Sequence, residues 1–250
     1  MDNKLWNWAH LETSHNYWTK QYSDITIEGF AEEFNIRNAF VVSFRDNINP
    51  PFDRLADRLK SLNDIKWSIM GDASSSIPEE ELGYTEYIIE TAKTHPNITG
   101  AVIDDFYSPK RLAKFPPEIL RKIQARLHEN GLDFWCVLYS NHIGNDDVKH
   151  YYDCFDGITY WLYTEDEVNN MEDYVEKFMA MFPDKKKMLG IYTYDYAGNR
   201  ERDTEQFKMQ LGYCKKFLDE GKVDGVIFCS GCIGDLDIEA NHILKDFAKE

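Results

Sequence analysis

Short apolar runs alternate with helical patterns along the whole chain, and this alternation constrains the fold more than any single motif does. Strands that each lead through a helix to the next strand run parallel and are joined by right-handed crossovers. Eight such units close most economically as a (β/α)8 barrel, the TIM barrel, and an open doubly wound sheet is the alternative. The predicted strands are Lys4–Ala9, Ala39–Phe44, Ile65–Met70, Thr99–Asp104, Asp133–Ser140, Gly157–Leu162, Lys187–Tyr194 and Val223–Cys229. The first of them, KLWNWA, is the weakest prediction because it is short and rich in tryptophan.

Helix starts and stops lie between these runs, where the barrel requires helices. A short polar residue followed three positions later by Glu or Gln caps a helix, proline fits the first helical turn, and glycine ends a helix. These signals are Thr164 with Glu167, Asp203 with Gln206, the segment Ser76-Ile77-Pro78-Glu79, the pair Pro116-Pro117, and the two glycines Gly131 and Gly221. With no linker between units, residues 1–250 are predicted to form one barrel domain.

Charge and composition restrict the partners. The chain has 28 Lys and Arg against 44 Asp and Glu, a formal net charge of −16, which opposes binding to nucleic acid or to an anionic membrane. A neutral or cationic small molecule is favoured. No apolar run approaches the roughly 20 residues of a membrane span, and the start of the chain lacks a signal-peptide pattern. The expected location is the cytoplasm, or the exterior with a leader absent from this sequence; five cysteines, an odd number, fit a reducing compartment.

The ends of the predicted strands carry aromatic and polar residues, and a barrel of this type places its site there. Aromatic faces stack on the apolar faces of sugar rings, while polar side chains bind the hydroxyl groups, so the predicted ligand is a neutral carbohydrate bound without a cofactor. The predicted substrate-binding residues are Trp8, His10, Glu12, Arg45, Tyr107, Tyr139, His142, Trp161, Tyr192 and Tyr194.

The stretch ITGAVIDDFYSP ends the fourth predicted strand on two carboxylates, Asp104 and Asp105. Successive side chains of a strand point to opposite faces, so only one of the two can face the barrel mouth while the strand stays regular. Glycoside hydrolysis uses two carboxyl groups on either side of the scissile bond. The second one is therefore expected from another strand, and Asp195, in GIYTYDYAGN at the end of the seventh, is the candidate.

These positions give the chain a resemblance to the (β/α)8-barrel glycoside hydrolases. Many members of that class place the acid/base at the end of strand four and the nucleophile at the end of strand seven, which implies an acid role for Asp104 or Asp105 and a nucleophile or base role for Asp195. The members usually carry Glu at both places. The segment TGAVIDDF also looks like the strand-four motif of chitinase-type enzymes, in which Gly100 and Asp104 match and Phe106 replaces the acid Glu.

Two alternatives stay open at this stage. A carbohydrate-binding barrel without catalysis shares the aromatic rim, and the missing Glu pair favours it. A metal-dependent hydrolase of the amidohydrolase type is vaguely similar through His10, Glu12, His142 and Asp235, but that type uses paired histidines on strand one and another on strand six, so no metal is expected. His15 is expected at the surface, and Cys229 and Cys232 are expected to pack at the rim.

Overall fold

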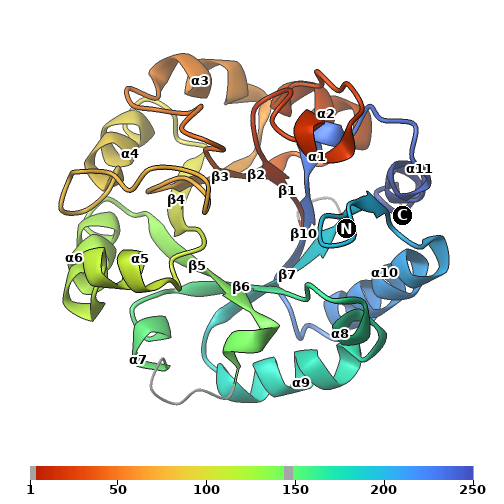
Figure 1. Cartoon of the computed structure of the whole chain (residues 1–250). Coiled ribbons are helices and arrows are strands. Elements are labelled where there is room, and N and C mark those ends of the chain that lie inside the picture. Colours follow the sequence, from red (N-terminus) through yellow and green to blue (C-terminus); the bar gives the residue numbers. More distant parts are fainter. Residues whose placement is uncertain (1–3, 144–148, 250) are drawn as a thin grey trace.

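The computed structural model describes residues 4–143 and 149–249 and forms a closed barrel of eight parallel strands surrounded by helices (Figure 1). This confirms the predicted TIM barrel; the alternative of an open sheet is wrong. Around the barrel the strands follow the order β1-β10-β7-β6-β5-β4-β3-β2. They are β1 (Leu5–Ala9), β2 (Asn38–Val41), β3 (Asp64–Ser68), β4 (Ile98–Ile103), β5 (Asp133–Tyr139), β6 (Gly157–Trp161), β7 (Lys186–Tyr192) and β10 (Gly225–Cys229).

The short tryptophan-rich β1 is a full barrel strand. Trp6 lies in register with Ile227 of β10 on one side and with Asn38 of β2 on the other, and both pairings are parallel. The weakest prediction from the sequence is therefore confirmed, and β1 is the strand that closes the barrel between the first and last units.

Helices cover the outside of the barrel, and most of their predicted boundaries are confirmed. Thr164 accepts a hydrogen bond from Glu167 N, Asp203 accepts one from Gln206 N, and Pro117 is the first residue of its helix. The helices are α1 (Asn16–Thr19), α2 (Ile27–Phe34), α3 (Asp53–Arg58), α4 (Thr85–Ala92), α5 (Pro109–Lys114), α6 (Pro117–His128), α7 (Lys149–Tyr152), α8 (Glu165–Asn169), α9 (Met171–Met181), α10 (Thr204–Asp219) and α11 (Glu239–Phe247). Single 3₁₀ turns are η1 (Leu59–Ser61), η2 (Ser140–His142) and η4 (Gly231–Ile233), and a hairpin comprises β8 (Tyr194–Asp195) and β9 (Arg200–Glu201).

One predicted helix start is wrong. The segment Ser76-Ile77-Pro78-Glu79 is a loop, and α4 begins later, at Thr85. Asp46 explains the difference, because its carboxylate accepts hydrogen bonds from both the backbone N and the hydroxyl of Ser76, each at 2.8 Å. These bonds hold the loop against the segment that follows β2. The loop therefore forms part of the carboxyl-terminal face of the barrel and is not helical.

The core has two layers, separated by the strands. Outward-facing side chains pack against the helices, and inward-facing ones fill the barrel, as period-two alternation in a closed sheet requires. In β5, for example, Phe134 and Cys136 belong to the outer layer and Trp135 to the inner one. The inner layer consists of Trp6, Trp8, Phe40, Val42, Val102, Trp135, Val137, Trp161, Met188, Ile227 and Cys229.

Glycines make room for the large rings inside the barrel. Gly157 lies in register with Trp135 of β5, and Gly190 lies in register with Trp161 of β6. A Cβ atom at either glycine would overlap the ring of its neighbour. The interior therefore fits the Trp135 and Trp161 rings because the register partner of each is a glycine.

Within residues 4–143 and 149–249, no helix combines the length and the apolar character needed to cross a membrane. All five cysteines are buried and form no disulfide. That residues 1–250 form one domain stays a prediction.

The glycine packing leads to a stability prediction. Gly190→Ala places a methyl group against the Trp161 ring and should lower the free energy of unfolding by about 1–3 kcal/mol, the usual cost of overpacking a core. Gly212→Ala is the matched control: Gly212 lies on α10 with nothing near its Cβ position, so alanine should raise stability by about 0.5–1 kcal/mol. Urea unfolding of both variants measures the difference, and equal stabilities would contradict this account of the barrel interior.

Candidate functional site

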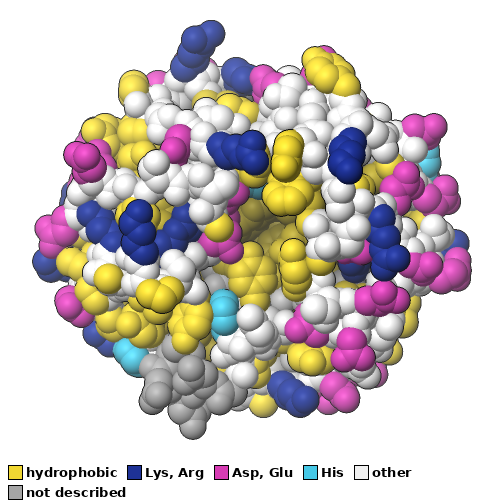
Figure 2. Space-filling model, in the orientation of Figure 1, with side chains coloured by type: hydrophobic (Ala, Val, Ile, Leu, Met, Phe, Trp, Pro, Cys, Tyr) yellow, Lys and Arg dark blue, Asp and Glu magenta, His cyan; other side chains and the backbone are white. Residues whose placement is uncertain are grey.

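A cavity of about 290 Å³ opens at the centre of the carboxyl-terminal face of the barrel. Figure 2 shows it as a central hollow in which hydrophobic side chains predominate. Its size is near the lower end of small-molecule sites, which span roughly 300–1,000 Å³. The lining residues are Trp8, His10, His15, Trp18, Phe44, Arg45, Asp72, Ala73, Ser74, Asp104, Asp105, Val137, Tyr139, Trp161, Tyr163, Tyr192, Tyr196 and Cys229.

Both adjacent aspartates at the end of β4 line this cavity. The strand ends at Ile103, and Asp105 has a φ of +43°, a left-handed conformation that is uncommon outside glycine. The alternation expected of a regular strand therefore stops at Asp104. Both aspartates therefore face the barrel mouth.

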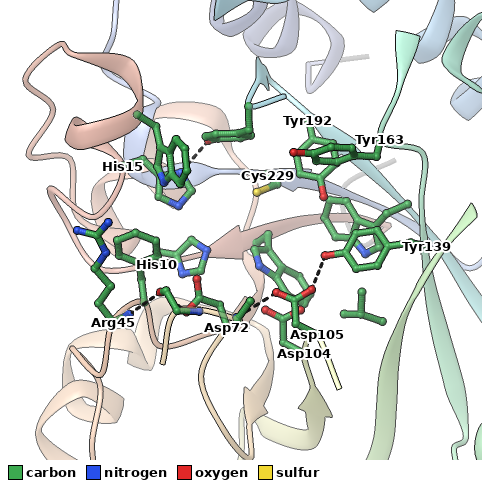
Figure 3. A pocket seen from close by; sticks show the side chains of 18 residues that line it. His10, His15, Arg45, Asp72, Asp104, Asp105, Tyr139, Tyr163, Tyr192 and Cys229 are labelled. Atoms are coloured by element: carbon green, nitrogen blue, oxygen red, sulfur yellow. Dashed lines mark hydrogen bonds between the residues drawn. The ribbon is translucent and has the colours of Figure 1, made fainter. Parts of the chain in front are cut away.

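Two neighbouring loops hold the Asp105 carboxylate in place (Figure 3). The Tyr139 hydroxyl, at the end of β5, donates a hydrogen bond to Oδ1 at 2.8 Å, and the backbone N of Ala73, after β3, donates one to Oδ2 at 3.1 Å. Each oxygen thus has one protein donor from a different strand end. This fixes the orientation of the group that the left-handed turn brings into the cavity.

Asp104 has a different environment. It is 4% exposed, and burial, followed by the charges of Asp105 and Asp72, raises its pKa well above the ordinary value of 3.8. Arg111 opposes this shift only in part, because its guanidinium donates to the backbone carbonyls of Asp104 and Asp72. The carboxyl group is therefore held in its protonated form to a higher pH than an exposed aspartate.

Asp72, after β3, adds a third carboxyl group to the cavity. Its Oδ1 accepts hydrogen bonds from the backbone N of Ser74 at 3.2 Å, from the Ser74 hydroxyl at 2.7 Å and from the Ser75 hydroxyl at 3.1 Å. Asp72 was not among the predicted site residues. Its position directly after the third predicted strand was the signal that could have identified it.

Two buried histidines also line the cavity. His10 Nδ1 lies 2.9 Å from the Val42 carbonyl, and His15 Nδ1 lies 2.7 Å from the Tyr196 hydroxyl. Burial lowers the pKa of His10, and burial together with the neighbouring His10 lowers the pKa of His15 well below its usual range. The prediction that His15 lies at the surface is wrong: it is 6% exposed, because its ring packs among His10, Phe44 and Tyr196.

The structure brings most of the predicted site residues together. Trp8, His10, Arg45, Asp104, Asp105, Tyr139, Trp161 and Tyr192 all line the cavity. Tyr107 and His142 lie at an adjoining recess of about 150 Å³, which shares Asp105, Val137 and Tyr139 with the main cavity. Their rings are 4.3 Å apart between centroids.

Three predicted site residues, Glu12, Tyr194 and Asp195, do not line the cavity. Glu12 faces Arg58, with its Oε2 3.5 Å from Arg58 Nη2. Tyr194 is buried in a small cluster with Cys232 and Ile233. Neither lines the main cavity, so the structure does not place either side chain against a ligand there.

Asp195 is also outside the cavity. The chain turns into the β8–β9 hairpin after β7, where Asp195 accepts hydrogen bonds from Gly198 N at 2.8 Å and from Arg200 Nε at 2.9 Å. Burial acts to raise the pKa of Asp195, but these two hydrogen bonds and the charges of Arg202 and Arg200 together outweigh it, and the pKa is lowered. Its carboxylate lines a separate recess of about 310 Å³ that shares only Tyr163 with the cavity. The structure therefore does not bring Asp195 together with Asp104 and Asp105.

The residues suggested for a metal site are dispersed. His10 lines the cavity, His142 lies at the recess, and Asp235 accepts a hydrogen bond from Asp24 N at 3.3 Å. Among the described residues there is no group of three or more His, Cys, Asp and Glu side chains arranged to hold a metal ion. Cys229 lines the cavity, while Cys232 lies behind it, where burial raises the pKa of its thiol to about 12.

Comparisons with known proteins agree with the fold and go no further. No protein family model and no curated protein matches the chain. Among solved structures, the spore cortex-lytic enzyme SleL of Bacillus megaterium QM B1551 matches with a TM-score of 0.62 and 14% identity, over 98% of this chain and 73% of that one. A chitinase of Chromobacterium violaceum ATCC 12472 matches with a TM-score of 0.61 and 9% identity, over 98% of each chain.

Barrels of other function match as well. The tryptophan synthase complex of Pyrococcus furiosus matches with a TM-score of 0.53 and 11% identity, over 100% of this chain and 97% of that one. The chain has a TIM-barrel fold that resembles those of chitinases and related glycoside hydrolases, several of which are among its structural neighbours. At these identities the likeness establishes the fold, and the function has to be argued from the site.

The environment of Asp104 leads to a prediction about stability. A carboxyl group whose pKa is raised by folding stabilises the fold while protonated and loses that contribution as pH rises from the unfolded value, near 3.8, through the folded one. Asp104→Asn cannot ionise and should be more stable than the parent at neutral pH, by about 1 kcal/mol or more. The gain should shrink towards pH 4.

Chemical denaturation over this pH range measures the effect. Asp173→Asn, which removes an exposed aspartate of α9, is the matched control and should stay within about 0.5 kcal/mol of the parent throughout. A lower stability of Asp104→Asn at neutral pH would show that the Asp104 carboxylate is stabilised by contacts that outweigh its burial.

Proposed function

We propose that this protein is a glycoside hydrolase that acts on a glycoside without negative charge. The observation that carries the proposal is the pair of adjacent carboxyl groups in one aromatic-lined cavity, Asp104 buried and Asp105 held by two donors. Two carboxyl groups whose surroundings differ in this way can divide the acid and base roles.

In the proposed reaction, Asp104 is the general acid. Its raised pKa keeps a proton available near neutrality, and it transfers this proton to the glycosidic oxygen as the bond from that oxygen to the anomeric carbon breaks. Asp105 provides the carboxylate for the positive charge that develops at the anomeric carbon, either as nucleophile or as base for the attacking water. Water supplies the hydroxyl group of the product and restores the proton on Asp104.

The aromatic walls are suited to hold a sugar ring against these groups. Trp8 and Trp161 meet edge to face with ring centroids 5.3 Å apart, and Tyr192 packs on Trp161 at 5.1 Å. The indole N of Trp161 donates to the Thr159 hydroxyl at 2.9 Å, which fixes the ring. We propose that these residues bind the ring whose bond is cleaved, and that Tyr107 and His142 bind the leaving group in the adjoining recess.

A second candidate function is a carbohydrate-binding barrel without catalysis. Phe106 favours it, because this residue replaces the acid Glu of the chitinase-type motif, is fully buried and packs on Phe155 at 5.7 Å between centroids. If Asp105 does not compensate for the missing Glu, the cavity would bind sugar and not cleave it. Measurable binding together with an absence of turnover on every glycan tested would select this function.

Substitution of Asp105 tests the catalytic proposal. Asp105→Asn keeps the size of the side chain and one of its two acceptor oxygens but removes the charge, so hydrolysis of a responsive glycoside should fall by at least about a hundredfold in kcat. Asp195→Asn removes an equal charge in the neighbouring recess, and we expect it to change kcat by no more than about threefold. Steady-state hydrolysis of one glycoside by the parent and both variants provides the comparison.

The two variants also decide between the aspartates. A loss with Asp195→Asn as large as that with Asp105→Asn would support a pair between strands four and seven and require the hairpin to move on binding. Full activity of Asp105→Asn would remove Asp105 from the mechanism.

A further inference from the structure

Two acceptor atoms of residues that line the cavity have no donor among the described residues. His10 is 4% exposed and lines the cavity, and with its Nδ1 proton directed at the Val42 carbonyl, the neutral ring presents Nε2 as an unpaired acceptor. Within the described part of the chain, Asp72 uses only Oδ1 for hydrogen bonds, which leaves Oδ2 without a donor. A ligand that satisfies both groups has to bring N–H or O–H donors.

Positive charge is scarce in the same place. Among the described residues that line the cavity, the only permanently charged cation is Arg45. It is exposed, with its guanidinium 5.1 Å from the ring centroids of Tyr17 and Phe44. The lowered pKa values of His10 and His15 keep both rings neutral at physiological pH. The described residues that line the inner part of the cavity therefore bear carboxylates and no cation. The nearest fixed cation is Arg111, which lies behind the acids and donates to the backbone carbonyls of Asp104 and Asp72, so their carboxylates stay open to a ligand.

The walls supply the other element of cation recognition. Trp8, Trp161, Tyr139 and Tyr192 line the same cavity as the acids. Figure 3 shows the Tyr139 hydroxyl directed at Asp105. The negative face of an aromatic ring attracts an ammonium group, more strongly when water is excluded. Carboxylates and aromatic faces around one small cavity are complementary to a compact cation with several N–H donors.

We propose that the sugar ring bound in this cavity carries a protonated amino group, which donates to Asp72 Oδ2 and His10 Nε2. The substrate class would be an amino sugar with a free amine, and this inference rests on the proposed function for the sugar itself. A ring without the amine would displace water from Asp72 Oδ2 and His10 Nε2 and offer them fewer donors in return, which costs binding free energy.

A matched pair of ligands tests the proposal. A glucosamine trimer and its N-acetylated counterpart differ at the amine alone, so calorimetric titration of each, slightly below neutrality where the amine is protonated, isolates its contribution. We expect the free-amine trimer to bind at least about tenfold more tightly. Asp72→Asn keeps the acceptor Oδ1 for Ser74 and Ser75 but removes the charge, and should weaken only the free-amine trimer, by about tenfold.

Asp173→Asn is the control for the general negative charge of the protein, and it should leave both affinities unchanged. Equal binding of the two trimers, or no binding of either, would overturn the proposal, as would an equal loss with both aspartate variants. The hydrolase proposal fails separately: tight binding of the free-amine trimer without turnover of any glycan would retain the amine site and reject catalysis.

Discussion

The hydrogen bonds of β1 to β10 and β2 are the constraint on which the rest of the structure depends. They close the sheet, and a closed parallel sheet has an interior that side chains must fill. Trp6 and Trp8 of the same strand point into that interior, and Trp8 reaches the cavity. One five-residue strand therefore both completes the barrel and supplies part of the floor of the site. Without the pairing of β1 to both neighbours, the sheet would stay open and the cavity at its carboxyl-terminal face would not form.

Dense packing below the cavity restricts the positions that its acidic side chains can adopt. The Trp8 ring lies against both Phe40 and Trp161, and Gly190 in the adjacent strand leaves room for Trp161. A packed interior permits few rearrangements, so groups that emerge from it are held with little freedom. Asp104 emerges from this layer and is enclosed, whereas Asp105 lies one residue further out and is held by hydrogen bonds from β5 and the loop after β3. The same rigid support gives two neighbouring carboxyl groups different properties.

The sequence predicts the elements that follow a regular hydrophobic pattern. Its predictions fail in the loops, where there is no such pattern. All eight barrel strands, the capping residues Thr164 and Asp203, and the aromatic strand ends follow from alternation and local chemistry. The loop at Ser76 depends on Asp46, thirty residues earlier, and the burial of His15 depends on Tyr196, far along the chain. Asp195 was expected at the cavity as the end of the seventh strand, but it belongs to the β8–β9 hairpin after β7 and lines a separate recess. Contacts between distant loops decide the site, and a single sequence does not contain them.

The left-handed residue at the end of β4 connects these observations. In a regular strand Asp104 and Phe106 would share the inward face, and Asp105 would point outward. The positive φ at Asp105 reverses this: Asp105 lines the cavity, and Phe106 packs outside the barrel on Tyr152 and Phe155. The position that corresponds to the acid Glu of the chitinase-type motif is thereby converted into core, while its neighbour brings a carboxylate to the mouth. A motif that is broken in sequence can therefore still deliver an acidic group to the cavity, because the conformation of a single residue decides which side chain faces it.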